Sequence, residues 1–161
     1  MEYFILRQDR NLTGAIKPLN LSWQKKIHDF EDITVVERDK QSHEQYVDFL
    51  DSPRAIASDK LKRILSEYSS QIIFKILMLV DVKSIYWLFE VPKIDCLSPN
   101  TELQKKDKVT RLVLDREKAK DHAVFSVEGI LEPYIIINLN VAEKIFQQDP
   151  WGIILQEVEA I

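Results

Sequence analysis

The sequence predicts an α+β fold in which a mixed, largely antiparallel sheet carries two or three packed helices. Two observations favour this class. Residues 72–80 and 86–91 are rich in apolar and aromatic side chains and are separated by a short polar link, a pattern typical of an antiparallel hairpin. Residues 58–69 repeat apolar side chains at helical spacing. At 161 residues the chain can bury one core, so we expect a single domain over residues 1–161.

The amino-terminal part of this domain, residues 1–53, has the least regular pattern. A strand is predicted at residues 3–7 and a weaker one at 33–37. Residues 38–45 are almost wholly polar and predict a surface loop. This part therefore offers few regular elements from which to build the sheet.

The remaining part, residues 54–161, has clearer signals. A helix is predicted to begin after Ser58, whose side chain can cap it, and to end near Ser69. Its apolar face holds Leu61, Ile64 and Leu65. Further strands are predicted at residues 111–114, 123–127 and 134–137. The order of these elements is that of a sheet with a few helices packed on it.

An internal similarity relates two stretches of this part. Residues 55–77 and 135–157 align without gaps at an offset of 80, and each reads as strand, polar cap, helix and strand. Ser58 matches Asn138 at the cap, and the pair Ile73 and Phe74 matches Ile153 and Ile154. Two hypotheses stay open: two related strand-helix-strand units, or a coincidence of pattern.

Composition limits the classes of partner. The 26 acidic and 22 basic residues are interspersed and give a net charge of -4, which disfavours nucleic-acid binding. The longest apolar stretch, residues 72–82, is broken by Lys75 and Asp81 and is too short to span a bilayer, so we expect no membrane partner. The amino terminus has no secretory signal pattern, and the lone Cys96 fits a reducing compartment. We therefore expect a cytoplasmic protein.

No catalytic, cofactor or metal site is predicted. Three glycines cannot form a dinucleotide or P-loop motif, and the three histidines are too far apart in sequence to share one helix face as metal ligands. The cluster at residues 28–32, which contains His28, is better explained as a solvated turn than as an active site. Cys96 is expected to be a buried packing residue, because its neighbour Asp95 would raise its pKa. We expect no enzyme.

The tryptophans are the candidate anchors for a protein partner. Trp87 lies among alternating apolar residues and is expected in the core. Trp23 and Trp151 lie in looser sequence context and are predicted to be exposed and available for partner binding.

Several stretches resemble one known family. Residues 53–61 look like a strand leading into a capped helix, 86–97 look like an aromatic strand followed by Asp95 and Cys96, and the elements in 112–158 follow in the same order. Together they resemble the bacterial immunity protein 11 family, whose members are predicted to neutralise polymorphic toxins. Residues 11–45 have no counterpart in this resemblance.

The resemblance implies an immunity protein that binds a cognate toxin stoichiometrically and has no enzymatic activity. It implies no particular contact residue, toxin activity or oligomeric state. Since loops held by a rigid sheet vary easily, we predict that residues 11–45 determine which toxin is bound. The alternative hypothesis is a small α+β enzyme or ligand-binding domain with a cryptic pocket.

Overall fold

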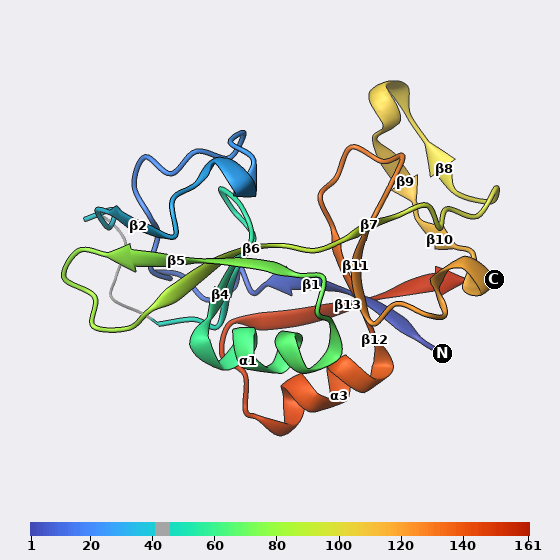
Figure 1. The fold of residues 1–161 in the computed structure, drawn as a ribbon. Coiled ribbons are helices and arrows are strands. Elements are labelled where there is room, and N and C mark those ends of the chain that lie inside the picture. Colours follow the sequence, from blue (N-terminus) through green and yellow to red (C-terminus); the bar gives the residue numbers. More distant parts are fainter. Residues whose placement is uncertain (41–45) are drawn as a thin grey trace.

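The computed structural model describes residues 1–40 and 46–161, so the predicted loop at 38–45 lies largely outside the described residues. Helices α1 (Asp59–Tyr68) and α3 (Leu139–Gln147) lie side by side on one face of the strands (Figure 1). A one-turn helix α2 (Arg116–Ala119) and the 3-10 helices η1 (Ile27–Asp29) and η2 (Lys105–Asp107) lie outside this layer. The α+β class predicted from the sequence is confirmed.

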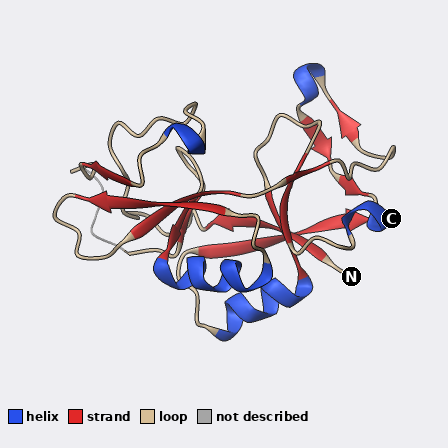
Figure 2. Cartoon of the chain, in the orientation of Figure 1, coloured by secondary structure: helices blue, strands red, loops and turns tan. Residues whose placement is uncertain are grey.

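The described strands form three sheets (Figure 2). The five-stranded sheet has the order β2 (Ile33–Val36), β5 (Ile73–Leu79), β6 (Tyr86–Glu90), β4 (Ile56–Ser58), β3 (Phe49–Leu50). The six-stranded sheet has the order β10 (Val113–Leu114), β13 (Ile153–Ala160), β1 (Tyr3–Gln8), β12 (Ile135–Asn138), β11 (Val124–Val127), β7 (Lys93–Ile94). Strands β8 (Glu102–Leu103) and β9 (Val109–Arg111) pair only with each other. Most pairs are antiparallel, and three are parallel, β2 with β5, β10 with β13 and β7 with β11.

The predicted helix and hairpin are confirmed. The Ser58 side chain accepts a hydrogen bond from the Leu61 backbone N–H, and α1 ends at Tyr68, next to the predicted Ser69. Strands β5 and β6 pair antiparallel as expected from their sequence. The predicted strand at 111–114 is instead split, because β9 pairs with β8 while β10 pairs parallel to β13. The chain thus leaves one sheet for another within these residues.

The internal similarity corresponds to a repeated topology. In the five-stranded sheet, β4 and β5 flank β6 and are both antiparallel to it, and α1 connects them. In the six-stranded sheet, β12 and β13 flank β1 in the same way, and α3 connects them. The outer strands agree as well, since β2 is parallel to β5 and β10 is parallel to β13. The chain therefore contains two related strand-helix-strand units, each completed by a central strand from elsewhere in the chain.

The central strands β6 and β1 are equivalent residue by residue. Tyr86 pairs with the cap residue Ser58, and Tyr3 pairs with the cap residue Asn138. On their other sides Tyr86 pairs with Leu77, and Tyr3 pairs with Val158. The strands that follow the two helices therefore correspond to each other at an offset of 81 residues rather than 80. The predicted match of Ile73 to Ile153 is wrong by one position.

The cause of this shift is the connection that follows each helix. Four residues separate α1 from β5, 69–72, whereas five separate α3 from β13, 148–152. The longer connection contains Asp149 and Gly152, both at positive φ. A one-residue difference in a loop changes which residues face the helix, because side chains alternate along a strand.

Buried apolar side chains fill three regions. One lies beneath α1 and α3 and draws on both sheets, as in Leu6, Phe89 and Ile137. A second lies on the opposite face of the five-stranded sheet and includes Ile16, Leu21, Ile27 and Phe30. A third lies on the opposite face of the six-stranded sheet and includes Tyr3, Cys96 and Phe125. The irregular amino-terminal segment is thus a layer of the core, which its sequence pattern does not show, because its apolar residues follow no regular period.

Candidate functional site

The predicted partner-binding residues are exposed on separate segments. Trp23, in the loop before η1, exposes 68% of its surface, and Trp151, in the loop between α3 and β13, exposes 51%. Among the described residues the two rings do not stack on each other. The loop that carries Trp23 is held by Arg54, which donates hydrogen bonds to the carbonyls of Ser22 and Lys25 at 3.2 and 2.6 Å.

Trp87 differs from its prediction. It is half-buried rather than in the core, because its ring lies under α1, where the helix provides polar neighbours. Its indole N–H donates to Asp59 Oδ1 at 3.1 Å, and Lys62 Nζ lies 4.7 Å from the ring centroid. Such an amphipathic ring at the margin of a helix tolerates partial exposure.

The most elaborate polar cluster surrounds Asp48, a residue that the sequence analysis did not identify. Its carboxylate is buried, with Oδ1 accepting a hydrogen bond from the Ser58 hydroxyl at 2.7 Å and Oδ2 accepting one from the Trp151 backbone N–H at 2.7 Å. Its backbone N–H donates to the Trp151 carbonyl at 2.8 Å, and its carbonyl accepts from Ser58 N–H at 2.8 Å. Asp48 therefore joins the start of α1 to the loop that follows α3.

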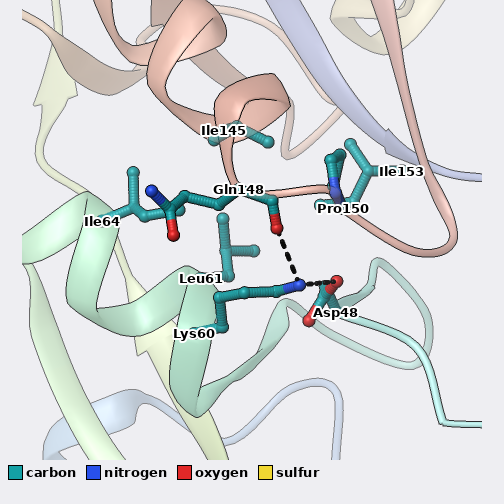
Figure 3. Close-up of a pocket in the computed structure, with 8 residues that line it drawn as sticks. All are labelled: Asp48, Lys60, Leu61, Ile64, Ile145, Gln148, Pro150 and Ile153. Atoms are coloured by element: carbon teal, nitrogen blue, oxygen red, sulfur yellow. Dashed lines mark hydrogen bonds and ion pairs between the residues drawn. The ribbon is translucent and has the colours of Figure 1, made fainter.

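Lys60 completes this cluster (Figure 3). Its Nζ lies 3.5 Å from Asp48 Oδ2 and donates to the carbonyls of Gln148 and Asp149, both at 3.0 Å. These carbonyls belong to the end of α3, where a cation is favourable because carbonyl groups lack helical partners there. Lys60 thus closes the carboxyl end of one helix from the first turn of the other.

The geometry of the Asp48 cluster is that of a structural clamp. Both carboxylate oxygens are engaged within the chain, so none is directed at an open site. The hollow beside it has a volume of about 10 Å³, roughly the space that one water molecule needs and far below the ~300 Å³ lower range of small-molecule pockets. Its lining is mainly aliphatic and consists of Asp48, Lys60, Leu61, Ile64, Ile145, Gln148, Pro150 and Ile153.

A sequence signal for this clamp exists in retrospect. Asp48 is a single acid between the apolar residues Val47 and Phe49, a context in which a buried carboxylate requires partners. The partners themselves were not predictable, because Trp151 is 103 positions away in the sequence.

Cys96 is buried, as predicted. Burial, together with the smaller effect of the nearby carboxylates of Asp95 and Asp115, raises the pKa of its thiol to about 11. The thiol is therefore neutral near pH 7, which is the form suited to packing.

The cluster at residues 28–32 is a surface turn. His28 and its acidic neighbours are exposed, while Ile27 and Phe30 are buried and fix the turn to the sheet. Lys75, which lies on β5, donates a hydrogen bond to the Phe30 carbonyl. Among the residues that the structure describes, no three His, Cys, Asp or Glu side chains gather as metal ligands would.

Comparison with protein-family models and with curated proteins gives no match for this chain. The resemblance to the immunity protein 11 family therefore stays a prediction from the sequence. No helix within the described residues is long and apolar enough to cross a membrane.

Proposed function

We propose that this chain is a cytoplasmic immunity protein that binds a cognate bacterial toxin stoichiometrically and neutralises it without catalysis. The family resemblance of residues 47–161 supports the proposal. A second support comes from the surface, where the aromatic rings of Trp23 and Trp151 are presented to solvent on loops. Exposed tryptophans are the side chains that most often anchor protein interfaces.

The contrast between the interior and the surface is the observation that carries this proposal. The buried Asp48 and Ser58 and the partly exposed Lys60 direct their polar groups at one another and at helix ends. The exposed side chains that lack such contacts include large apolar ones, Val35 among them. This arrangement suits a contact surface better than a catalytic pocket. The small hollow at Asp48 does not favour the alternative, a ligand-binding domain.

Residues 11–45 remain the region that we propose determines which toxin is bound, but only some positions within it can vary. Ile16, Leu21, Ile27 and Phe30 belong to the core, so a wholesale exchange of the segment would disturb the fold. The exposed positions between these residues are the ones that can vary with the partner.

The direct test is co-expression of this chain with the polypeptide encoded by the adjacent gene. Rescue of growth together with co-purification of a complex at one-to-one stoichiometry is the expected result. A stable complex should bury at least about 1,200 Å² in total. Failure of any toxin to bind, combined with turnover of a substrate by the purified chain, would show that the chain is an enzyme instead.

A further inference from the structure

An apolar patch lies at the edge of the five-stranded sheet, where α1 no longer covers it. Lys62 of α1 reaches the ring of Trp87, and the same face then continues onto β5 and β2. Paired residues point to the same face of a sheet, and the register pairs Trp87 with Ile76, Ile76 with Ile33, and Met78 with Val35. We call Ile33, Val35, Ile76 and Met78 the β2 edge patch.

The outer residues of this patch are exposed, with 62% of Val35 and 52% of Ile33 accessible. Figure 1 shows β2 beside β5 at the end of the sheet remote from the chain termini. Apolar edge strands are uncommon in soluble proteins, which usually protect their edges with charges or a covering segment. The β2 edge patch therefore requires an explanation.

The backbone of β2 is also open along this edge. The carbonyls of Asp32 and Val36 accept hydrogen bonds from β5 N–H groups, both at 3.0 Å, so the residues between them alternate in direction. Ile33 and Val35 consequently turn their N–H and C=O groups outward. Further along the same edge, residues 37–39 pair with residues 17–19. Among the described residues this covering segment stops short of Ile33 and Val35.

The six-stranded sheet supplies an internal control. Its strand β10 occupies the place of β2, and residues 96–98 of the chain cover its edge, with Ser98 N–H donating to the Val113 carbonyl at 2.9 Å. The positions equivalent to Ile76 and Met78 hold Glu157, which pairs with Phe4, and Glu159, which pairs with Val113. The fold therefore accepts charged residues and a covering segment at this place, whereas the β2 edge patch consists of apolar residues and no covering segment lies along it among the residues that the structure describes.

We infer that the β2 edge patch binds an extended segment of the toxin, which adds a strand to the five-stranded sheet. The segment would pair with the outward groups of Ile33 and Val35 and place its alternate apolar side chains beside those of Ile33 and Val35, on the face that Ile76 and Met78 continue. This inference rests on the proposed function, since the toxin is the partner.

The charges around β2 define the chemistry of this segment. Glu31 and Asp32 precede the strand and Glu37 follows it, and all three are exposed. No ion pair joins them to another described residue. The bound segment should therefore carry Lys or Arg opposite Glu31 and Asp32 and beside Glu37, where the neighbouring Arg38 offsets part of the acidic charge. This complementarity also speeds association.

The same charges disfavour a second copy of this chain as the occupant. In an antiparallel pairing of Ile33 with Val35 of another copy, Glu31 of each copy would stand opposite Glu37 of the other. Like charges directly opposite each other on paired strands are destabilising. A basic segment of a different protein meets no such repulsion.

The test compares two patch variants, Ile33→Lys and Val35→Lys, with the control Leu131→Lys. Leu131 is 63% exposed and lies in the turn before β12, away from the patch. Affinity for the adjacent-gene polypeptide is measured by calorimetry with wild type and each variant. We expect roughly a 100-fold loss of affinity for the patch variants, because each places an amine in the apolar contact and near the Lys or Arg side chains proposed for the bound segment. We expect a change within about twofold for the control.

Unfolding midpoints in urea are expected to be unchanged in all three variants, which shows that any loss arises at the surface. Amide hydrogen exchange provides an independent measurement, since the N–H groups of Ile33 and Val35 should exchange at least about 10-fold more slowly in the complex. Glu37→Lys should slow association by about 10-fold at low salt.

The outcomes separate the two proposals. If all variants bind the polypeptide as tightly as wild type, the patch is not the docking site while the immunity function stands. If wild type does not bind it, the proposed function is wrong and this inference falls with it. If wild type is a dimer that Val35→Lys dissociates, a second copy covers the patch and the toxin-strand inference is overturned.

Discussion

The hydroxyl of Ser58 serves two partners at once, because it donates to the buried Asp48 carboxylate at 2.7 Å and accepts from the Leu61 N–H at 3.1 Å. The first bond ties α1 to strand β3, and the second caps α1. At the equivalent position Asn138 caps α3 through its Oδ1 alone, at 3.1 Å from the Val141 nitrogen. The Ser58 side chain therefore both caps α1 and supplies a hydrogen bond to Asp48, whereas the Asn138 side chain only caps α3.

The first prediction compares the two cap variants Ser58→Ala and Asn138→Ala. Loss of a cap alone should cost about 1 kcal/mol, which is the expectation for Asn138→Ala. Ser58→Ala also leaves Asp48 Oδ1 without its hydrogen-bond donor in a buried site, so the total cost should reach about 2–4 kcal/mol. The free energy of unfolding in urea measures both. Ser66→Ala, at an exposed position of α1, is the control and should stay within about 0.5 kcal/mol. Equal costs for the two caps would contradict the double role of Ser58.

The second prediction concerns the two equivalent tyrosines. The Tyr86 hydroxyl donates to the Val47 carbonyl at 3.1 Å in a buried site, and burial raises its pKa. Tyr86→Phe should therefore cost about 1–2 kcal/mol, since it leaves a buried carbonyl without its donor. Tyr3 is equally buried, but its hydroxyl has no hydrogen-bond partner among the described residues, so Tyr3→Phe should cost less than about 0.5 kcal/mol. Chemical denaturation of both variants decides this, and a larger loss for Tyr3→Phe would refute it.

The third prediction is a dependence of stability on pH through Cys96. Its pKa is raised to about 11 in the folded chain, against 9.0 for an ordinary thiol. Between these values the unfolded chain loses a proton that the folded chain keeps, so the free energy of unfolding falls as pH rises. This contribution amounts to at most about 1.4 kcal/mol per pH unit and vanishes below the ordinary pKa.

The measurement compares wild type with Cys96→Ala in urea from pH 7 to 10.5. The variant should be less stable at pH 7, because a buried side chain has been shortened. The difference between the two proteins should then shrink above pH 9. A constant difference across this range would show that the thiol does not titrate in the way the structure indicates. Toxin binding should survive the substitution, since Cys96 lies in the interior.

Local elements were predictable from the sequence, and long-range ones were not. The cap at Ser58, the helix that follows and the hairpin of β5 and β6 depend on residues close together in the chain, which leave a periodic pattern. The insertion of β1 between β12 and β13 depends on partners about 130 or more positions away, and no local pattern encodes it. The buried layer at Ile16 and Leu21 was missed for the same reason, since only the sheet beneath makes those residues core.

The candidate partner-binding surface also contains some residues that were predictable from the sequence and others that were not. Trp23 and Trp151 were identified because they lie in looser sequence context, unlike Trp87 among its alternating apolar neighbours, and both are exposed. The Asp48 clamp and the β2 edge patch were missed because each brings together side chains from several elements. Val35 becomes exposed only because α1 ends its coverage near Trp87, a relationship that appears in the packing and not in the sequence.

The last prediction uses the equivalence of β1 and β6. Each is the central strand of one strand-helix-strand unit. We therefore expect the fold to form whether β1 or β6 comes first in the chain. The ends of the chain lie close together, since Tyr3 pairs with Val158 and Arg116 donates to the carbonyls of both Met1 and Ala160. A circular permutant can therefore join residue 161 to residue 1 through a short glycine and serine linker and open at residues 81–84, an exposed turn.

This permutant begins with β6, passes from β13 through the linker into β1, and ends with β5, and it keeps every strand pairing of the present chain. We expect the same far-ultraviolet circular dichroism spectrum and a free energy of unfolding within about 2 kcal/mol of wild type. A second permutant that opens within β12, between Ile136 and Ile137, is the control and should fail to fold, because it cuts a buried strand. If the first permutant is as disordered as the second, the connection between β5 and β6 is required for folding and the two central strands are not interchangeable in chain order.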